Sequence, residues 1–538
     1  MFIKKLTRQV ICNLDEPVVS TPNGRLRGVQ VDDGYIFRGI KYADAARFAM
    51  PKPVEPWEGV KDAIMYGYAC PEISTGVPGD GYTVPHLFCP QHEDCQYLNI
   101  WTQSIDPAAK KPVMVWLHGG GYSTGSGVEH YAYDGEELSA HGDVVVVTLN
   151  HRLNVLGHLD LSAYGDEYQH SANLGIIDIV AALEWVKKNI ACFGGDPDNV
   201  TIFGQSGGGG KVLTLMQMPA ADGLYHRAVV QSGVFTPAPA EAARKASRHL
   251  AELVLEELGT DAEGAKTVPY TVLAAAASRA TARLMAEGTV GFSWAPVPDG
   301  EYYVGYPTHV GFRKEALHVP LMLGTVFAEF TSNYSTPIGD SRKNDWSDET
   351  AEGYINERFG EYAPGMIEGF KAAYPGRRLA DLLYLDTFVR RGTAEMAKLR
   401  AKQGGKAWCY LFDLETPFKN GTLAWHNSEI PYVFHNAEYI EASYIPGVSE
   451  PLQDLVSGAW VSFAKNGDPN HPGMPAWDKA TETSCPTMIF DRKSYVAVDH
   501  DQALLDAAPK MRSLSSLFAK KKDKPAQPVH APQGPQKK

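Results

Sequence analysis

The middle of the chain alternates short, fully apolar segments with longer segments of helical periodicity. Pro112 to Leu117 and Asp143 to Leu149 are rich in valine and bounded by polar or glycine-rich residues, which is typical of buried strands. Between Gly175 and Ile190 the apolar residues recur every three or four positions, so we predict an amphipathic helix. Val200 to Phe203 then predicts a further buried strand.

The same alternation continues beyond Ser206. The pattern predicts a helix over Gly207 to Met218 and a strand over Arg227 to Gln231, which is typical of repeated βαβ units in a parallel sheet. The other predicted elements are helices at Glu241 to Leu258, Tyr270 to Glu287, Asp381 to Lys402 and Leu452 to Asn466, and a strand at Val319 to Gly324. We therefore predict an α/β fold with a central, mostly parallel sheet, helices on both faces and helical insertions.

Three regions of the chain are distinguished by composition. Residues 1–17 form an N-terminal extension, and residues 18–517 form a single catalytic domain because no strong linker interrupts them. Residues 518–538 are rich in Lys, Pro and Gln and have almost nothing to bury. We expect this basic tail to be a disordered, solvated terminus rather than a docking arm.

Charge and cysteine content exclude several classes of function. The formal net charge of -13 would repel a phosphate backbone, so nucleic acid is not expected as a partner. No apolar stretch approaches the roughly 20 residues of a membrane span, and no secretory h-region follows the basic N-terminus. We expect a cytoplasmic protein, or a secreted one if the chain is a processed form. The 7 cysteines lack CxxC spacing, which argues against a disulfide scaffold and a zinc site.

Ser206 lies in a Gly-x-Ser-x-Gly run, Gly204 to Gly208, between the predicted strand and the predicted helix. Such a run occurs by chance in flexible loops. A strand before it and a helix after it are the context of a nucleophile elbow, in which glycines permit the sharp turn that exposes the serine. We therefore predict that Ser206 is a nucleophile.

A second glycine run, His118 to Tyr122, follows the predicted strand that ends at Leu117. By itself it is equally consistent with a tight turn. Its position upstream of Ser206 is that of an oxyanion loop, whose consecutive glycines let backbone N–H groups face a substrate oxygen.

Over roughly Val18 to Phe490 the chain resembles the type-B carboxylesterases, which include bacterial para-nitrobenzyl esterases, mammalian carboxylesterases and cholinesterases. The motifs that carry the resemblance are Glu93 to Trp101, Asn150 to Leu153 and Asn189 to Gly204. The resemblance implies an α/β-hydrolase fold and a small-molecule ester substrate. We expect no metal and no cofactor, and the oligomeric state is left open.

The resemblance also assigns the site residues. It makes Ser206 the nucleophile, His426 the base and Glu329 the acid of a triad. The oxyanion donors would be the backbone N–H groups of three glycines, Gly120, Gly121 and Gly207. The chain order of serine, acid and histidine is that of α/β-hydrolases, and loops after parallel strands converge at one sheet edge.

Some positions depart from the family pattern. Glu329 lies between Ala328 and Phe330, where the family has an acidic residue and a glycine. Asp299 and Glu429 are therefore alternative candidates for the triad acid. Each of these two carboxylates could instead serve to stabilise a turn or cap a helix. Gln205 replaces the usual Glu and Gly207 the usual Ala. The neutral Gln205 should weaken attraction to cationic substrates, so we expect neutral, fairly hydrophobic esters.

The resemblance further pairs Cys70 with Cys95 around a loop that in the family borders the entrance to the site, and this loop carries Tyr82, His86 and Phe88. The expected activity is ester hydrolysis through an acyl-serine intermediate. The alternatives are an amidase, lactonase or transacylase with the same triad, or a non-catalytic binding protein on the same scaffold.

Overall fold

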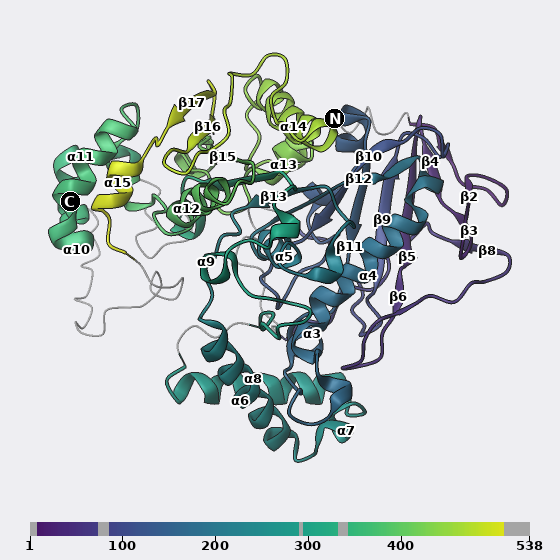
Figure 1. Ribbon diagram of the computed structural model, residues 1–538. Helices are drawn as coiled ribbons and strands as arrows, with labels where there is room; N and C mark the ends of the chain where they lie inside the picture. The colour runs from purple at the N-terminus through teal and green to yellow at the C-terminus, as the bar shows by residue number, and fades with distance from the viewer. Residues whose placement is uncertain (1–7, 74–84, 290–293, 332–342, 511–538) are drawn as a thin grey trace, which may run out of the picture.

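A twelve-stranded sheet forms the centre of the described part of the protein (Figure 1). The computed structural model describes residues 8–73, 85–289, 294–331 and 343–510. The central strands run parallel and lie side by side in the order β11 (Val145–Leu149), β10 (Lys111–Leu117), β12 (Gly195–Gln205), β13 (Arg227–Gln231), β14 (Leu321–Val326), β15 (Ala407–Phe412) and β16 (Pro486–Phe490).

Antiparallel strands extend this sheet at both ends. They are β9 (Tyr97–Thr102), β5 (Gly34–Lys41), β4 (Val29–Val31) and β1 (Val10–Ile11) beyond β11, and β17 (Tyr495–Val498) beyond β16. Two small sheets accompany it, one of β2 (Val18–Thr21), β3 (Gly24–Arg27) and β8 (Val60–Asp62), the other of β6 (Ala43–Asp44) and β7 (Lys52–Pro53).

Helices cover the sheet and form two peripheral groups. The helices near the sheet are α2 (Glu136–Gly142), α3 (Asn154–His158), α4 (Leu174–Asn189), α5 (Gly207–Leu215), α9 (Pro307–Val310), α12 (Val389–Lys402), α13 (Ile430–Val433) and α14 (Ser449–Asn466). Figure 1 shows one peripheral group below the sheet, α6 (Ala240–Leu258), α7 (Ala262–Ala265) and α8 (Tyr270–Ala286). It shows the other at the left, α10 (Asp348–Phe359), α11 (Ala363–Ala373) and α15 (Gln502–Ala507).

The central strands are buried on both faces because their side chains alternate between two separate cores. On β10, Met114 and Trp116 join the core that also holds Phe203, whereas Val113 and Val115 join the core against α4. This two-sided burial explains why the sequence shows continuous apolar runs there instead of an alternating pattern.

A buried ion pair anchors the loop after β11 to α4. The guanidinium of Arg152 donates two bonds to the carboxylate of Asp178, Nε to Oδ2 at 2.8 Å and Nη2 to Oδ1 at 2.7 Å. Both side chains are almost fully buried, and the carboxylate helps to raise the pKa of Arg152. The pair explains the Asn150 to Leu153 motif as a structural anchor.

The predicted α/β class with its mostly parallel sheet is confirmed, and the predicted elements of the central region are present with shifted ends. The predicted helix over Gly207 to Met218 ends earlier, at Leu215.

The helix predicted over Asp381 to Lys402 is wrong as a single element. A 3-10 turn at Leu379–Leu383 comes first, and α12 begins only at Val389. The carboxylate of Asp386 accepts hydrogen bonds from the backbone N–H groups of Phe388 and Arg390, which starts a new helix there.

The structure describes part of the predicted N-terminal extension and none of the predicted C-terminal tail. Val10 and Ile11, in the predicted N-terminal extension, pair with β4 at the sheet edge. The predicted tail at 518–538 and Tyr82 lie outside the described residues. Within the described ranges, no helix is both long enough and apolar enough to cross a bilayer.

Candidate active site

Ser206 occupies a strained turn between β12 and α5. Its φ of 59° and ψ of −125° lie in a region that residues with a side chain rarely adopt. Two backbone bonds hold the turn: the Ser206 N–H donates to Gln231 O at 2.8 Å, and the Gly210 N–H donates to Ser206 O at 3.0 Å. The serine is thereby held at the carboxyl edge of the parallel sheet, half-buried.

The glycines on either side of Ser206 are required by close backbone contacts. A Cβ atom at Gly204 would lie 2.6 Å from both Leu117 O and the carbonyl carbon of Gly208. A Cβ at Gly208 would overlap Leu117 O and lie 2.9 Å from His118 O. The elbow and the end of β10 therefore pack backbone against backbone, which only glycine allows.

The three predicted oxyanion glycines meet at this contact. Gly120 and Gly121 follow β10 with φ values of 77° and 65°. A Cβ atom at Gly207 would lie 2.5 Å from Gly121 N and overlap Gly121 O. The structure thus places the first turn of α5 directly against the glycine loop.

Glu329 and His426 also lie together, although 97 positions separate them in the chain. Glu329 follows β14, and its Oε2 lies 2.5 Å from His426 Nδ1. Its other oxygen accepts a bond from the Val326 N–H at 3.0 Å, and the His426 N–H donates to Glu329 O at 2.9 Å. The carboxylate is fully buried, whereas 16% of the His426 side chain is exposed.

The second ring nitrogen of His426 has no hydrogen-bond partner among the described residues, so no bond joins it to Ser206 Oγ in this structure. The ring of Phe330 packs against the imidazole with centroids 4.0 Å apart. The unbonded Nε2 is thus the nitrogen that can exchange a proton with a nucleophile.

The two alternative acids have other partners. The Oδ1 of Asp299 accepts bonds from the backbone N–H groups of residues 301–303, and its Oδ2 accepts one from Asn173, which is turn chemistry. Glu429 accepts a bond from Gln231 Nε2 at 3.2 Å. The imidazole of His426 is therefore paired with Glu329.

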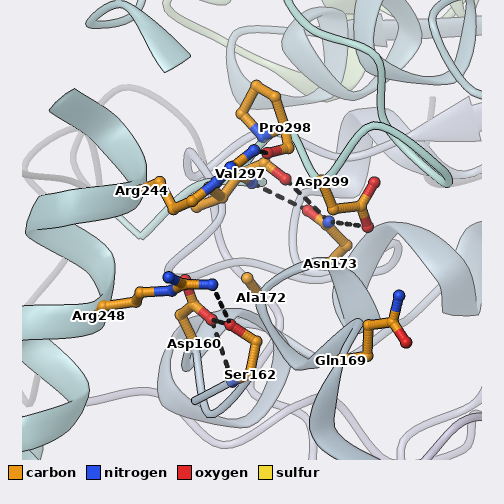
Figure 2. A pocket seen from close by; sticks show the side chains of 10 residues that line it. All are labelled: Asp160, Ser162, Gln169, Ala172, Asn173, Arg244, Arg248, Val297, Pro298 and Asp299. Atoms are coloured by element: carbon orange, nitrogen blue, oxygen red, sulfur yellow. Dashed lines mark hydrogen bonds and ion pairs between the residues drawn. The ribbon is translucent and has the colours of Figure 1, made fainter. Parts of the chain in front are cut away.

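Asp299 also lines a cavity of about 210 Å³ (Figure 2). Its other polar side chains include Arg244, Arg248, Asp160 and Ser162. In Figure 2 Ser162 Oγ accepts a bond from Arg248 Nη2 at 3.2 Å and donates one to Asp160 Oδ1, whereas Arg244 donates to the Pro298 carbonyl. Ser206, Glu329, His426 and the three glycines do not line this cavity, which is a crevice beside α6.

Two further buried carboxyl groups lie near Glu329. Burial, followed by the negative charge of Glu329, raises the pKa of Glu429 to about 7 and that of Asp386 to about 7. The Gln231 that bonds Glu429 also accepts the Ser206 N–H through its backbone oxygen. Gln231, on β13, therefore bonds both to the turn at Ser206 and to Glu429 of the acidic cluster, which consists of Glu329, Glu429 and Asp386.

Lys211 is a residue of the site region that the sequence analysis did not single out. It is fully buried on α5, and its Nζ donates to His118 O at 2.9 Å. Burial lowers its pKa to about 7. The sequence signal that could have identified Lys211 is a charged residue within an otherwise apolar predicted helix. The lysine ties the nucleophile helix to the glycine loop.

Cys70 and Cys95, which the resemblance pairs, are both buried free cysteines in contact with each other. The Cys70 sulfur also accepts the Leu153 N–H at 3.2 Å. In the chain they flank the segment that carries His86 and Phe88.

Comparison with known proteins identifies the family of the chain. The model of the carboxylesterase family matches residues 15–504. The chain is 32% identical over 499 residues to the para-nitrobenzyl esterase of Bacillus subtilis (strain 168), covering 90% of this chain and 96% of that protein.

Solved structures of esterases are similar to this chain in both sequence and fold. An esterase of Clostridium hathewayi, described as able to hydrolyse aliphatic aromatic polyesters, is 46% identical with a TM-score of 0.87, covering 93% of this chain and 99% of that one. A carboxylesterase of Geobacillus stearothermophilus is 33% identical with a TM-score of 0.70, covering 91% and 100%. The chain therefore belongs to the carboxylesterase family and is a carboxylic ester hydrolase with the α/β-hydrolase fold.

Proposed function

We propose that the protein hydrolyses neutral, fairly hydrophobic carboxylic esters through an acyl-serine intermediate. Ser206 acts as nucleophile, His426 as general base and acid, and Glu329 as the residue that orients His426. The contact of 2.5 Å between Glu329 and His426, at the same sheet edge as the strained Ser206 turn, is the observation that carries the proposal.

The reaction proceeds in two halves. His426 Nε2 takes the Ser206 proton as Oγ attacks the ester carbonyl, and the N–H groups of Gly120, Gly121 and Gly207 stabilise the oxyanion. His426 then protonates the leaving alcohol. In the second half it activates a water that releases the acid and restores Ser206.

Two buried carboxyl groups, Glu429 and Asp386, lie near Glu329. Because the pKa values of Glu429 and Asp386 are raised to about 7, these groups are largely protonated below neutral pH. In their neutral form they add no negative charge beside Glu329, which can stabilise the imidazolium that forms during attack through its contact with His426.

The side chains around the site support a neutral substrate. Gln205, next to the nucleophile, is buried and carries no charge. Phe330 lies against His426 and packs near Phe235, with ring centroids 6.2 Å apart. The neutral Gln205 and the aromatic rings of Phe330 and Phe235 favour apolar acyl and alcohol groups. A cytoplasmic location stays a prediction.

Polyesters form a second candidate substrate class. The Clostridium hathewayi esterase that is 46% identical hydrolyses aliphatic aromatic polyesters. In this chain Phe88 is 91% exposed and Tyr131 is 45% exposed. Their segments lie side by side, because the Tyr131 N–H donates to Pro85 O at 3.4 Å. Exposed aromatic rings suit a polymer that must dock from the surface.

The triad assignment predicts selective loss of chemistry. Ser206→Ala, His426→Ala and Glu329→Gln should each lower kcat toward a para-nitrophenyl ester by about a thousandfold or more, with little change in KM. A fluorophosphonate probe should label the wild type and spare Ser206→Ala. Equal labelling of both would overturn the nucleophile, and faster turnover of matched amides or lactones than of esters would favour the alternative reactions.

Gly207→Ala should damage the oxyanion hole although the family usually has alanine there. The added methyl would overlap Gly121, so the glycine loop must shift, and the loss of one donor costs about 100-fold in kcat. Gly353→Ala is the matched control, since α10 offers open space at that position. Wild-type kcat in Gly207→Ala would contradict this account.

Glu429→Gln should stabilise the protein selectively at high pH. The pKa of Glu429 rises from 4.5 to about 7 on folding, so the wild type loses stability between these pH values while the neutral amide does not. Relative to wild type, the variant should gain up to about 3 kcal/mol in free energy of unfolding at pH 8 compared with pH 4. Urea unfolding measures this gain, and exposed Glu352→Gln is the control. An equal difference at both pH values would refute the prediction.

Phe88→Ser and Tyr131→Ser should lower the release of acid from an aliphatic aromatic polyester film several-fold, because the film loses apolar contacts. Turnover of a soluble short-chain ester should stay unchanged. Val272→Ser, at an exposed apolar position on α8, serves as control. No product release by the wild type would remove polyesters as substrates.

A further inference from the structure

Two histidines and a glutamate converge just beyond the glycine loop. His86, Glu129 and His130 each offer a ligand atom, and these atoms all lie within 4.8 Å of one another. We propose that they form a binding site for a divalent transition metal ion of the zinc class. The proposal concerns a site distinct from the triad and does not depend on the catalytic roles assigned above.

The three ligands come from two chain segments that the backbone holds together. His86 and His130 face each other in an antiparallel bridge, and the Leu87 N–H donates to Glu129 O at 2.5 Å. The His130 ring stacks on Tyr133 with centroids 4.6 Å apart and planes at 14°. Because these contacts already hold the ligand segments together, little further ordering of the side chains is needed when an ion binds.

The donor set matches the chemistry of zinc. Two imidazole nitrogens and one carboxylate oxygen are ligands that Zn²⁺ prefers, whereas Ca²⁺ and Mg²⁺ prefer oxygen alone. Two ligands that are each about 2.1 Å from zinc can be at most about 4.2 Å apart. His130 Nε2 and Glu129 Oε1 are 3.9 Å apart, within this limit, and the other pairs need to close by roughly 0.6 Å at most.

Burial and charge also suit a cation. The side chains of His130 and Glu129 are 8% and 20% exposed, so an ion bound there would be partly shielded from water. The carboxylate neutralises one of its two charges, and three protein ligands leave a coordination position for water.

The site adjoins the glycine loop. A Cβ atom at Gly125 would lie 3.0 Å from Glu129 Oε1 and 2.8 Å from His118 Nδ1. An ion held by Glu129 and His86 would therefore connect the segment before Phe88 to the segment that continues the glycine loop. We assign it a bracing role and no step of the hydrolysis.

A second cluster provides an internal control. His141, His435 and Asp454 also lie within 4.8 Å of one another, but on an exposed surface. His435 Nε2 already bonds Asp454 Oδ1 at 2.7 Å, and the two imidazoles stack face to face 3.9 Å apart. Like the proposed site, this cluster has two histidines and one carboxylate, but two of its three residues are exposed and no backbone bridge among the described residues joins its histidines.

The experiment is a metal titration of the full chain without an affinity tag, after removal of metals with a chelator. Zn²⁺ is titrated by calorimetry, and Co²⁺ is followed by its visible absorption. We expect saturable binding by the wild type, weakened by about tenfold or more in His86→Asn, Glu129→Gln and His130→Asn. Binding should stay within about twofold of wild type in the control His435→Asn.

Thermal unfolding supplies the second readout. Zn²⁺ should raise the Tm of the wild type and of His435→Asn but leave that of Glu129→Gln unchanged, because only an intact site binds the folded state. Ester hydrolysis without metal confirms that each variant is folded. His86 and Glu129 are only partly buried, so their variants test the site even if His130→Asn does not fold.

Three outcomes would overturn the proposal: no saturable binding by the wild type, unchanged affinity in His86→Asn and Glu129→Gln, or loss of binding in His435→Asn. A failure of the proposed triad would leave the titration unaffected, since it would alter only the probe labelling and turnover.

Discussion

Backbone contact between the first turn of α5 and the end of β10 is the constraint on which the active site depends. Side chains at Gly204, Gly207 or Gly208 would overlap Leu117, Gly121 or the turn itself. Because these positions are glycines, the turn at Ser206 and the glycine loop lie in direct backbone contact, as the proposed oxyanion hole requires. Lys211, bonded to His118 O, adds a side-chain tie across the same contact.

The strain at Ser206 is maintained by its neighbours. A φ of 59° is costly for serine, but the Ser206 N–H is bonded to β13 and its carbonyl accepts the first helical bond of α5. The surrounding sheet therefore holds a conformation that an isolated peptide would leave. Gly207 stands where the family usually has alanine, and a Cβ atom there would overlap Gly121 in this structure.

Burial also changes the pKa values of the carboxyl groups near Glu329. Glu329, Glu429 and Asp386 lie in one apolar region, where three ionised carboxylates would repel one another. The pKa values of Glu429 and Asp386 are raised, which favours the neutral form of these two groups. His86, Glu129 and His130, whose ligand atoms lie within 4.8 Å of one another, form the metal site proposed above.

The sequence by itself determined the features that depend on local spacing. Apolar runs predicted the central strands, and the glycine pattern predicted the turn at Ser206 and the loop at Gly120, because backbone sterics act between near neighbours. Family resemblance located Glu329 and His426, but the residue pattern left Asp299 and Glu429 open as acids.

Only the tertiary structure decided which groups meet. Glu329 contacts His426 across 97 positions because strands β14 and β15 bring their following loops to one edge. The break before α12 depends on the Asp386 carboxylate, whose bonds no helical periodicity reveals. The pattern of α5 shows a lysine among apolar residues, but its partner, His118 O, is decided by packing between distant segments, as is the convergence of His86 with His130. Such contacts depend on the whole sheet and its loops, so the local sequence pattern does not reveal which groups meet.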